Sequence, residues 1–314
     1  MLKVEDLAVH YIWRKTVRAL EEVSVEVKKG EIMGVVGESG SGKTTLGLSI
    51  LKLLPPNGRI VNGRIYLDDL DITSMTEEKM REIRGKQISM VFQDPMTSLD
   101  PLMSIGDQIT ETITTHEKIP KREAEEKALS LLEAVGISGD RFKDFPHQLS
   151  GGMRQRVMIA MALSLNPKLI VADEPTTALD VIVQDQIMDL FKSLRERFGV
   201  AFMLISHDLS LELEVADRIA VMYGGWLMEL SESNKIAEDP LSPYTKELLA
   251  AIPNIELEDQ KLRFIPGNPP DLSNPPSGCR FHPRCPSKMD ICSEKEPPIS
   301  NIGGRVVRCW LYGG

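Results

Sequence analysis

One stretch of the chain alternates between apolar and charged residues with the period of an α-helix. Between Lys121 and Val135 the apolar residues recur at helical spacing while Lys, Arg and Glu fill the other positions; they are Ala124, Ala128, Leu131, Leu132 and Val135. Such spacing places one apolar stripe against a core and leaves the charges in solvent. Gly136 follows and is typical of a helix end. The pattern predicts a half-buried helix over 121–135.

The segment 149–235 switches repeatedly between the helical and the strand period. It predicts a helix from Met153 to Leu165, a strand at Leu169–Ala172, a helix around Val183–Arg197 and a strand at Ala201–Ile205. Earlier in the chain, the apolar run Ile32–Val36 also has the length of a buried strand. Alternating helices and strands indicate an α/β fold, in which helices cover a mostly parallel sheet.

The composition changes after about residue 238. Twelve of the twenty prolines fall between Pro240 and Pro298, and all four cysteines lie in the same tail. Prolines at this density favour turns and extended segments, so we expect only a short helix near Tyr244–Ala251. The chain therefore divides into a larger domain, 1–238, and a small proline-rich, cysteine-containing C-terminal domain, 239–314.

Length, composition and charge exclude several classes of protein. The 314 residues are 42% hydrophobic and 26% charged, which is ordinary for a globular chain and unlike a disordered one. The net charge of -9 disfavours nonspecific nucleic-acid binding. The longest apolar run, Val157–Leu163, is far shorter than a membrane-spanning helix requires. Charged residues appear from Lys3 onward, before an apolar signal region could form, so we expect no secretory signal and a cytoplasmic location.

A phosphate-binding loop follows the first buried strand. The segment Gly37-Glu38-Ser39-Gly40-Ser41-Gly42-Lys43-Thr44 has two glycines at the required spacing, followed by Lys and Thr. Its small residues allow backbone N–H groups to surround phosphate oxygens, and Lys43 brings a positive charge to the β- and γ-phosphates. The Thr44 hydroxyl is a candidate ligand for Mg²⁺. The sequence predicts a nucleotide site here.

A pair of carboxylates supplies the second element of that site. Asp173 and Glu174 come directly after the predicted strand at 169–172. On a chain that also has a phosphate loop, the first carboxylate is suited to the metal and the second to orienting and deprotonating a water molecule.

Three further features are structural by default when each is taken alone. They are Gln93 in a turn, Ser150 as the N-cap of the helix that begins Leu149-Ser150-Gly151-Gly152, and His207 after a predicted strand. Their order along the chain, together with the phosphate loop, Asp173-Glu174 and Ala178-Leu179-Asp180, resembles the ATP-binding cassette (ABC) ATPases over about residues 1–235. The resemblance implies an ABC-type P-loop NTPase fold, with a RecA-like core, an antiparallel β subdomain and a helical subdomain inserted at about 95–165.

The resemblance also implies roles for individual residues in binding and hydrolysing ATP with Mg²⁺. Gly37, Ser39, Gly40, Ser41, Gly42, Lys43, Thr44 and Thr45 would hold the phosphates. Thr44, Gln93 and Asp173 would serve the metal, Glu174 would be the catalytic base, and His207 would contact the γ-phosphate. Tyr11, with Trp13 as its rival, would stack on adenine. Ser150, Gly151, Gly152 and Asp180 would act across the interface with a second cassette.

A narrower resemblance, to the ATPases of dipeptide and oligopeptide importers, rests on three segments. They are Phe92–Pro101, Pro146-His147-Gln148 and Ser242-Pro243-Tyr244-Thr245. The family implies an energy-coupling subunit at the cytoplasmic face of the cell membrane. Its partners would be a second ATPase, either a copy or a paralogue, two permeases and, indirectly, an extracytoplasmic substrate-binding protein, with no nucleic acid. An oligosaccharide importer is the alternative, and a soluble cassette ATPase acting on ribosomes or DNA is a remote one.

The four cysteines form a candidate metal site. Cys279, Cys285, Cys292 and Cys309 lack the Cys-x-x-Cys spacing usual for structural zinc, and their spacing leaves an iron–sulfur cluster, zinc and free thiols open. The segment Cys279–Pro286 is similar to the tail of peptide-importer ATPases. That resemblance implies a [4Fe-4S] cluster, which would help to fold a domain with little core of its own.

Overall fold

The computed structural model describes residues 1–252 and 264–313, which form two compact units. Unit 1 comprises residues 1–28, 32–75 and 205–314, and unit 2 comprises residues 29–31 and 76–204. The chain passes from unit 2 back into unit 1 within one strand, β8 (Ala201–Ser206). The predicted boundary at 238/239 does not coincide with this division and stays a prediction.

Unit 1 contains a four-stranded antiparallel sheet, as expected for the β subdomain. Its strands follow the order β2-β1-β4-β5, with the bounds β1 (Leu2–Ile12), β2 (Thr16–Val27), β4 (Gly58–Leu67) and β5 (Leu70–Asp71). In the second half of β2, buried Val23, Val25 and Val27 alternate with exposed residues. This period of two buries one face of the sheet and leaves the other in solvent.

A second set of strands in unit 1 carries the phosphate loop. Their order is β11-β12-β10-β9-β3, with the bounds β3 (Ile32–Val36), β9 (Arg218–Tyr223), β10 (Trp226–Glu232), β11 (Ile299–Ile302) and β12 (Arg305–Arg308). Strand β3 is buried throughout and pairs in parallel with β9. The remaining pairs are antiparallel. The parallel pairing expected from the alternating helices and strands is present between β3 and β9, and antiparallel strands extend this set towards the tail.

The tail is more regular than its prolines suggested. The helices of unit 1 are α1 (Lys43–Ile50), α8 (Leu209–Val215), α9 (Ser233–Glu238), α10 (Pro243–Ala250), α11 (Ile291–Glu294) and the 3₁₀ turn η3 (Trp310–Tyr312). The predicted short helix is α10. Strands β11 and β12 form a hairpin that was not predicted, and its Gly303-Gly304 turn has positive φ at both residues. That turn is a known hairpin signal.

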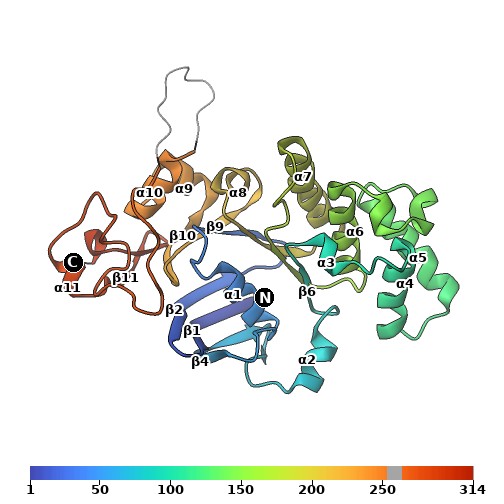
Figure 1. Cartoon of the computed structure of the whole chain (residues 1–314), viewed down its shortest axis with the longest axis horizontal. Helices are drawn as coiled ribbons and strands as arrows, with labels where there is room; N and C mark the ends of the chain where they lie inside the picture. The colour runs from blue at the N-terminus through green and yellow to red at the C-terminus, as the bar shows by residue number, and fades with distance from the viewer. Residues whose placement is uncertain (253–263, 314) are drawn as a thin grey trace. The chain divides into compact units, whose positions relative to one another are not determined.

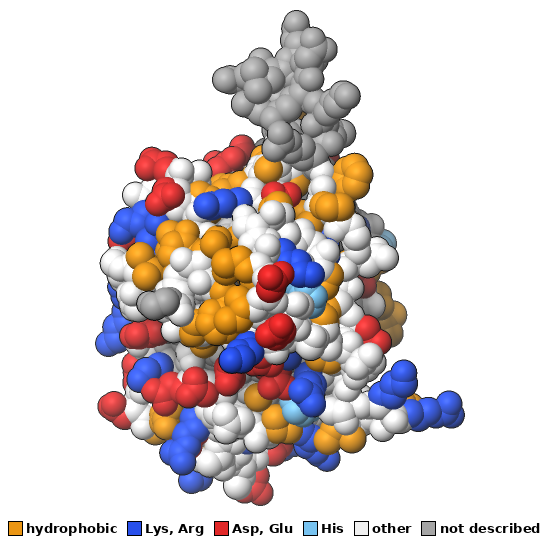
Figure 2. Space-filling model, turned by 90° about the vertical axis from the view of Figure 1, so that its left-hand side faces the viewer, with side chains coloured by type: hydrophobic (Ala, Val, Ile, Leu, Met, Phe, Trp, Pro, Cys, Tyr) orange, Lys and Arg blue, Asp and Glu red, His pale blue; other side chains and the backbone are white. Residues whose placement is uncertain are grey.

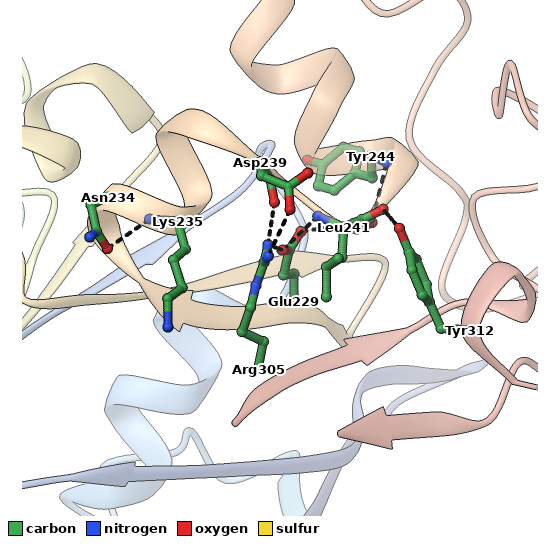
Figure 3. A network of polar contacts seen from close by, with 9 residues as sticks. Glu229, Asn234, Lys235, Asp239, Leu241, Tyr244, Arg305 and Tyr312 are labelled. Carbon is green, nitrogen blue, oxygen red and sulfur yellow. Dashed lines mark hydrogen bonds and ion pairs between the residues drawn. The ribbon is translucent and has the colours of Figure 1, made fainter. Parts of the chain in front are cut away.

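Two buried clusters join the tail to the rest of unit 1. The Glu229 carboxylate in β10 is fully buried and accepts hydrogen bonds from the backbone N–H groups of Leu241 (2.8 Å) and Ser242 (2.9 Å). It also pairs with Arg305 of β12 at 3.0 Å (Figure 3). In the second cluster, the guanidinium groups of Arg280 and Arg308 lie over the buried Trp226 ring. Strand β10 thus anchors both the start of α10 and the C-terminal hairpin.

The tail also keeps apolar side chains at its surface. Met289, Ile299, Ile302 and Leu311 are exposed, and Figure 2 shows hydrophobic side chains gathered between charged ones on the face that carries the tail.

Unit 2 contains the predicted helical subdomain (Figure 1). It also contains three strands in the order β8-β7-β6. Its elements are α2 (Glu77–Ile83), β6 (Ile88–Val91), α3 (Pro95–Ser98), α4 (Ile105–His116), α5 (Lys121–Ala134), η1 (Gly139–Lys143), η2 (Pro146–Gln148), α6 (Gly151–Leu163), β7 (Leu169–Asp173) and α7 (Val181–Phe198), followed by β8. Helices α4, α5 and α6 pack together. The predicted helices and strands at 121–135, 153–165, 169–172, 183–197 and 201–205 all agree with these elements to within two residues.

No helix in the described ranges 1–252 and 264–313 is both long and apolar enough to cross a membrane.

Helix α8 carries an acidic side chain into the core of unit 1. Glu212 is 1% exposed, and its Oε2 atom has no hydrogen-bond partner among the described residues. It packs against strand β3, where a Cβ added to Gly34 would lie 2.7 Å from Oε2. Desolvation raises the pKa of Glu212 well above its usual value, and the nearby Asp208 carboxylate raises it further.

This buried acid predicts a pH-dependent loss of stability. The folded state holds the proton to higher pH than the unfolded state does, so stability falls as pH rises above the ordinary carboxyl pKa. We expect Glu212→Gln, which cannot ionise, to melt above wild type at pH 8, by roughly 1.5 °C for each 1 kcal/mol of stability gained in a chain of this size. The gap should narrow towards pH 5. Parallel melting curves at the two pH values would contradict the assignment.

Candidate functional site

The residues predicted to bind and hydrolyse ATP are divided between the two units. Unit 1 holds the phosphate loop, Tyr11 and His207, while unit 2 holds Gln93, the segment 150–152, the carboxylates Asp173 and Glu174, and Asp180.

The phosphate loop connects β3 to α1 through a backbone that its glycines permit. Gly40 and Gly42 have φ of 77° and 101°, values that favour glycine. A Cβ on Gly37 would lie 2.0 Å from the carbonyl oxygen of Met222, and one on Gly42 would lie 2.6 Å from that of Ala19. Helix α1 begins without a side-chain cap, so its first N–H groups remain available to an anion.

Two polar groups of the loop are suited to phosphate. The Lys43 ammonium is buried and donates to the carbonyl oxygens of Gly37 (2.7 Å) and Glu38 (3.1 Å), which holds it across the loop. The Ser41 hydroxyl is buried and has no hydrogen-bond partner among the described residues. A buried hydroxyl without a partner is costly, and a phosphate oxygen would satisfy it. Thr44, the candidate metal ligand, is exposed.

Of the two candidates for stacking on adenine, Tyr11 contacts the residues that follow this loop. The Tyr11 hydroxyl, near the end of β1, is hydrogen-bonded to the Thr45 hydroxyl of α1 at 3.1 Å. Trp13, in the following turn, is 79% exposed. The contact favours Tyr11 as the residue beside the phosphates, and its stacking on adenine stays a prediction. His207 is exposed at the end of β8, directly before Asp208, which caps α8.

In unit 2 the structure brings Gln93 and Glu174 together. The Gln93 side-chain amide donates to Glu174 Oε2 at 3.2 Å, although 81 residues separate them. Strands β6 and β7 are parallel neighbours, so the residues that follow them meet at one edge. Glu174 has a φ of 46°, a backbone conformation that is uncommon for a residue other than glycine. Asp173, the last residue of β7, is 5% exposed.

Thr177 also belongs to this cluster and was not predicted from the sequence. Its hydroxyl donates to Glu174 Oε2 at 2.8 Å. The signal available was its position three residues after the glutamate, where a turn brings a hydroxyl back towards the carboxylate. Gln93 and Thr177 thus hold one carboxylate oxygen from two sides.

The Ser-Gly-Gly helix start is built as predicted. The Ser150 hydroxyl accepts a hydrogen bond from the Met153 N–H at 3.3 Å and caps α6. A Cβ on Gly152 would lie 2.5 Å from Val183, so the starts of α6 and α7 pack tightly. Asp180 caps α7 by accepting from the Val183 N–H at 3.0 Å. The next two residues, Val181 and Ile182, are 78% and 72% exposed, which leaves an apolar surface beside these caps.

The four cysteines line one small, closed cavity in the tail. Cys279, Cys285, Cys292 and Cys309 share it with apolar and aromatic side chains that include Phe281 and Trp310. Burial raises the pKa of Cys279 to about 12 and also raises the pKa values of Cys285 and Cys309. In the absence of a cation, these thiols are therefore protonated at neutral pH.

The convergence of the thiols does not amount to a preformed metal site. Within residues 1–252 and 264–313, no three His, Cys, Asp or Glu side chains are grouped so that they could hold a metal ion. The structure thus gives no support to the predicted [4Fe-4S] cluster beyond the shared cavity.

Comparison with known proteins gives the family. Residues 20–177 match the model for ABC transporters, and residues 228–292 match the model for the oligopeptide/dipeptide transporter C-terminal region. The chain belongs to the ABC transporter ATPases. This ABC ATPase is 47% identical to the oligopeptide transport ATP-binding protein AppD of Bacillus subtilis, over 99% of its own length and 97% of that protein. It is 43% identical to the oligopeptide transport ATP-binding protein OppD of Escherichia coli, over 99% and 93%.

Solved structures share the cassette fold of this ABC ATPase. A dimeric ATP-binding cassette in a post-hydrolysis state with ADP and Pi is 29% identical, with a TM-score of 0.67 over 74% of this chain and 99% of the other. The protein cbiO1 from Clostridium perfringens, part of the ABC transporter complex cbiONQ, is 28% identical, with a TM-score of 0.67 over 76% of this chain and 91% of the other. The predicted fold class is thereby confirmed.

Proposed function

We propose that this ABC ATPase is the ATP-hydrolysing, energy-coupling subunit of a binding-protein-dependent importer of dipeptides and oligopeptides. The observation that carries the proposal is similarity along nearly the whole chain, tail included, to oligopeptide and dipeptide transport ATP-binding proteins. The names of these relatives favour peptides over oligosaccharides as the cargo.

The chain's own residues are suited to each part of ATP hydrolysis. The phosphate loop and the start of α1 bind the phosphates, and Lys43 offsets their negative charge. Tyr11 stacks on adenine. Thr44, Gln93 and Asp173 would hold Mg²⁺, which would neutralise developing phosphate charge when bound. Glu174, fixed by Gln93 and Thr177, accepts a proton from the attacking water. His207 contacts the γ-phosphate.

A second cassette completes the site in this proposal. Ser150, Gly151 and Gly152 present the N-terminus of α6 to the nucleotide of the partner, and Asp180 lies at the same interface. The exposed Val181 and Ile182 beside them supply apolar surface that such an interface would bury. The partner is either a copy of this chain or a related ATPase.

A pocket in the helical subdomain is the proposed contact with the permeases, at the cytoplasmic face of the membrane. It has a volume of about 740 Å³ and lies between α4 and the segments around it, with lining residues that include Leu102, Lys121, Lys143 and Phe145. Leu102 is 85% exposed, and an apolar residue so exposed beside a polar rim is typical of a protein contact. A helix from a permease would fit this pocket.

The four cysteines are the proposed ligands of a [4Fe-4S] cluster. Their convergence on one cavity supports this assignment. A bound cluster would keep them as thiolates and cross-link a tail that has little apolar core.

The assignment of the catalytic base predicts the effect of Glu174→Gln. The amide cannot accept the proton, so steady-state hydrolysis should fall by about 100-fold or more while ATP binding is retained. Turnover and nucleotide titration on the same preparation measure both. Glu196→Gln, an exposed change on α7, is the control and should keep wild-type turnover. Near-normal turnover in Glu174→Gln would remove Glu174 from this role.

The permease contact predicts the effect of Leu102→Asp. A charge in the centre of an apolar contact should strip the permeases from the tagged subunit during gentle purification from membranes, with nucleotide binding intact. Val61→Asp, at an exposed apolar position in β4, is the control and should retain them. Equal recovery of permeases with both variants would exclude this pocket as their docking site.

The cluster predicts iron in protein that is purified without oxygen. We expect broad visible absorbance and about four iron atoms per chain, both lost in Cys292→Ser. Ser293→Ala leaves all four thiols in place and should keep the iron. Zinc, or no metal at all, in the anaerobic wild-type protein would contradict the cluster.

A further inference from the structure

A buried arginine of the tail reaches the phosphate loop. Arg284 forms a bidentate ion pair with Glu38, with distances of 2.6 Å from Nη1 to Oε2 and 2.9 Å from Nη2 to Oε1. The Arg284 side chain is 5% exposed. Glu38 follows Gly37 directly and so belongs to the loop itself. Two residues separated by 246 positions thus meet beside the proposed nucleotide site.

Groups other than Glu38 also hold the guanidinium of Arg284 in place. Its Nε donates to the carbonyl oxygen of Pro266 at 2.8 Å, and Nη2 donates to that of Ile265 at 3.2 Å. Nη1 also donates to the Tyr223 hydroxyl at 3.2 Å. Because all these N–H donors are hydrogen-bonded, the planar guanidinium is held in one orientation. Its bidentate pairing then fixes the orientation of the Glu38 carboxylate.

Tyr244 makes a second contact with the same loop residue. The Glu38 N–H donates to the Tyr244 hydroxyl at 3.1 Å. Tyr244 is fully buried and packs against the rings of Tyr223 and Phe281, with centroids 4.6 Å and 5.1 Å away. Its helix, α10, starts where the Glu229 carboxylate holds the Leu241 and Ser242 N–H groups (Figure 3).

Glu38 in turn connects these tail contacts to the phosphate-binding groups. Its carbonyl oxygen accepts hydrogen bonds from Lys43 Nζ at 3.1 Å and from the Ser41 N–H at 3.2 Å. The tail therefore binds the side chain and the N–H of Glu38. The carbonyl oxygen of the same residue accepts the hydrogen bond that positions Lys43. A carboxylate at this point would also repel phosphate unless a cation were paired with it.

We propose that Arg284 and Tyr244 are positioning residues through which the tail holds the phosphate loop ready for nucleotide, and that Arg284 neutralises the Glu38 carboxylate there. The inference rests on the proposed function of the loop as an ATP site. It assigns the tail a part in nucleotide affinity, separate from any metal that the cysteines hold.

Nucleotide binding by four variants of the full chain tests the proposal. We expect Arg284→Gln to raise the dissociation constant of ATP about tenfold, because it leaves Glu38 unpaired. Glu38→Gln should have a smaller effect, and the double variant should bind like Glu38→Gln alone, because the repelling charge has gone. Lys288→Gln is the control: this tail cation is exposed, so its loss should leave the affinity unchanged.

Two outcomes of the titration would overturn the proposal. One is wild-type affinity in Arg284→Gln. The other is a double variant whose defect equals the sum of the two single defects. Arg284→Lys keeps the charge and should recover part of the affinity, which a loss of folding in Arg284→Gln would not predict.

Hydrogen exchange without nucleotide separates this inference from the proposed function. Amides of residues 36–45 should exchange faster in Arg284→Gln and in Tyr244→Phe than in the wild type or in Lys288→Gln. If the wild type failed to bind ATP, the proposed function would fail, and the exchange comparison would still decide whether the tail holds the loop. Equal exchange in all four proteins would overturn the inference.

Discussion

The phosphate loop is packed so closely between two strands that only glycine fits at its ends. Gly37 lies against the Met222 carbonyl of β9, and Gly42 lies against the Ala19 carbonyl of β2. The Ser41 carbonyl then accepts a hydrogen bond from Gly225 in the β9–β10 turn. Within unit 1, the antiparallel sheet, the buried strands and the loop therefore share one junction. A shift of any of them would disturb the backbone that surrounds a phosphate.

The tail is built onto that junction and does not form a core of its own. Its largest buried rings, Tyr244 and Phe281, pack against Tyr223 of β9. Arg280 donates to the Gly224 carbonyl in the turn beside the loop. Buried charges are costly unless they are paired and hydrogen-bonded, and Glu229 and Arg284 both have such partners. A short proline-rich segment can therefore be ordered by the sheet it covers.

Local patterns predicted the elements whose own residues determine them. Helix α5 follows from its apolar stripe, β3 from its apolar run, and the loop between β3 and α1 from its glycines. The hairpin β11–β12 was missed although its Gly303-Gly304 turn is a local signal, whereas the pairing of β12 with the distant strand β10 leaves no local period. The contacts of Glu38 with Arg284 and of Glu174 with Gln93 likewise join distant segments. The resemblance to ABC ATPases predicted the role of Gln93, but no pattern indicated Arg284.

Coupling of ATP hydrolysis by this chain to peptide import is the property on which the proposed function depends. Its most direct test is the ATPase rate of the whole complex, with permeases, both ATPases and binding protein reconstituted in lipid vesicles. We expect peptide added with the binding protein to raise the rate several-fold and to enter the vesicles, while an oligosaccharide does neither. A rate that ignores peptide, or one that responds to the oligosaccharide instead, would contradict the claim.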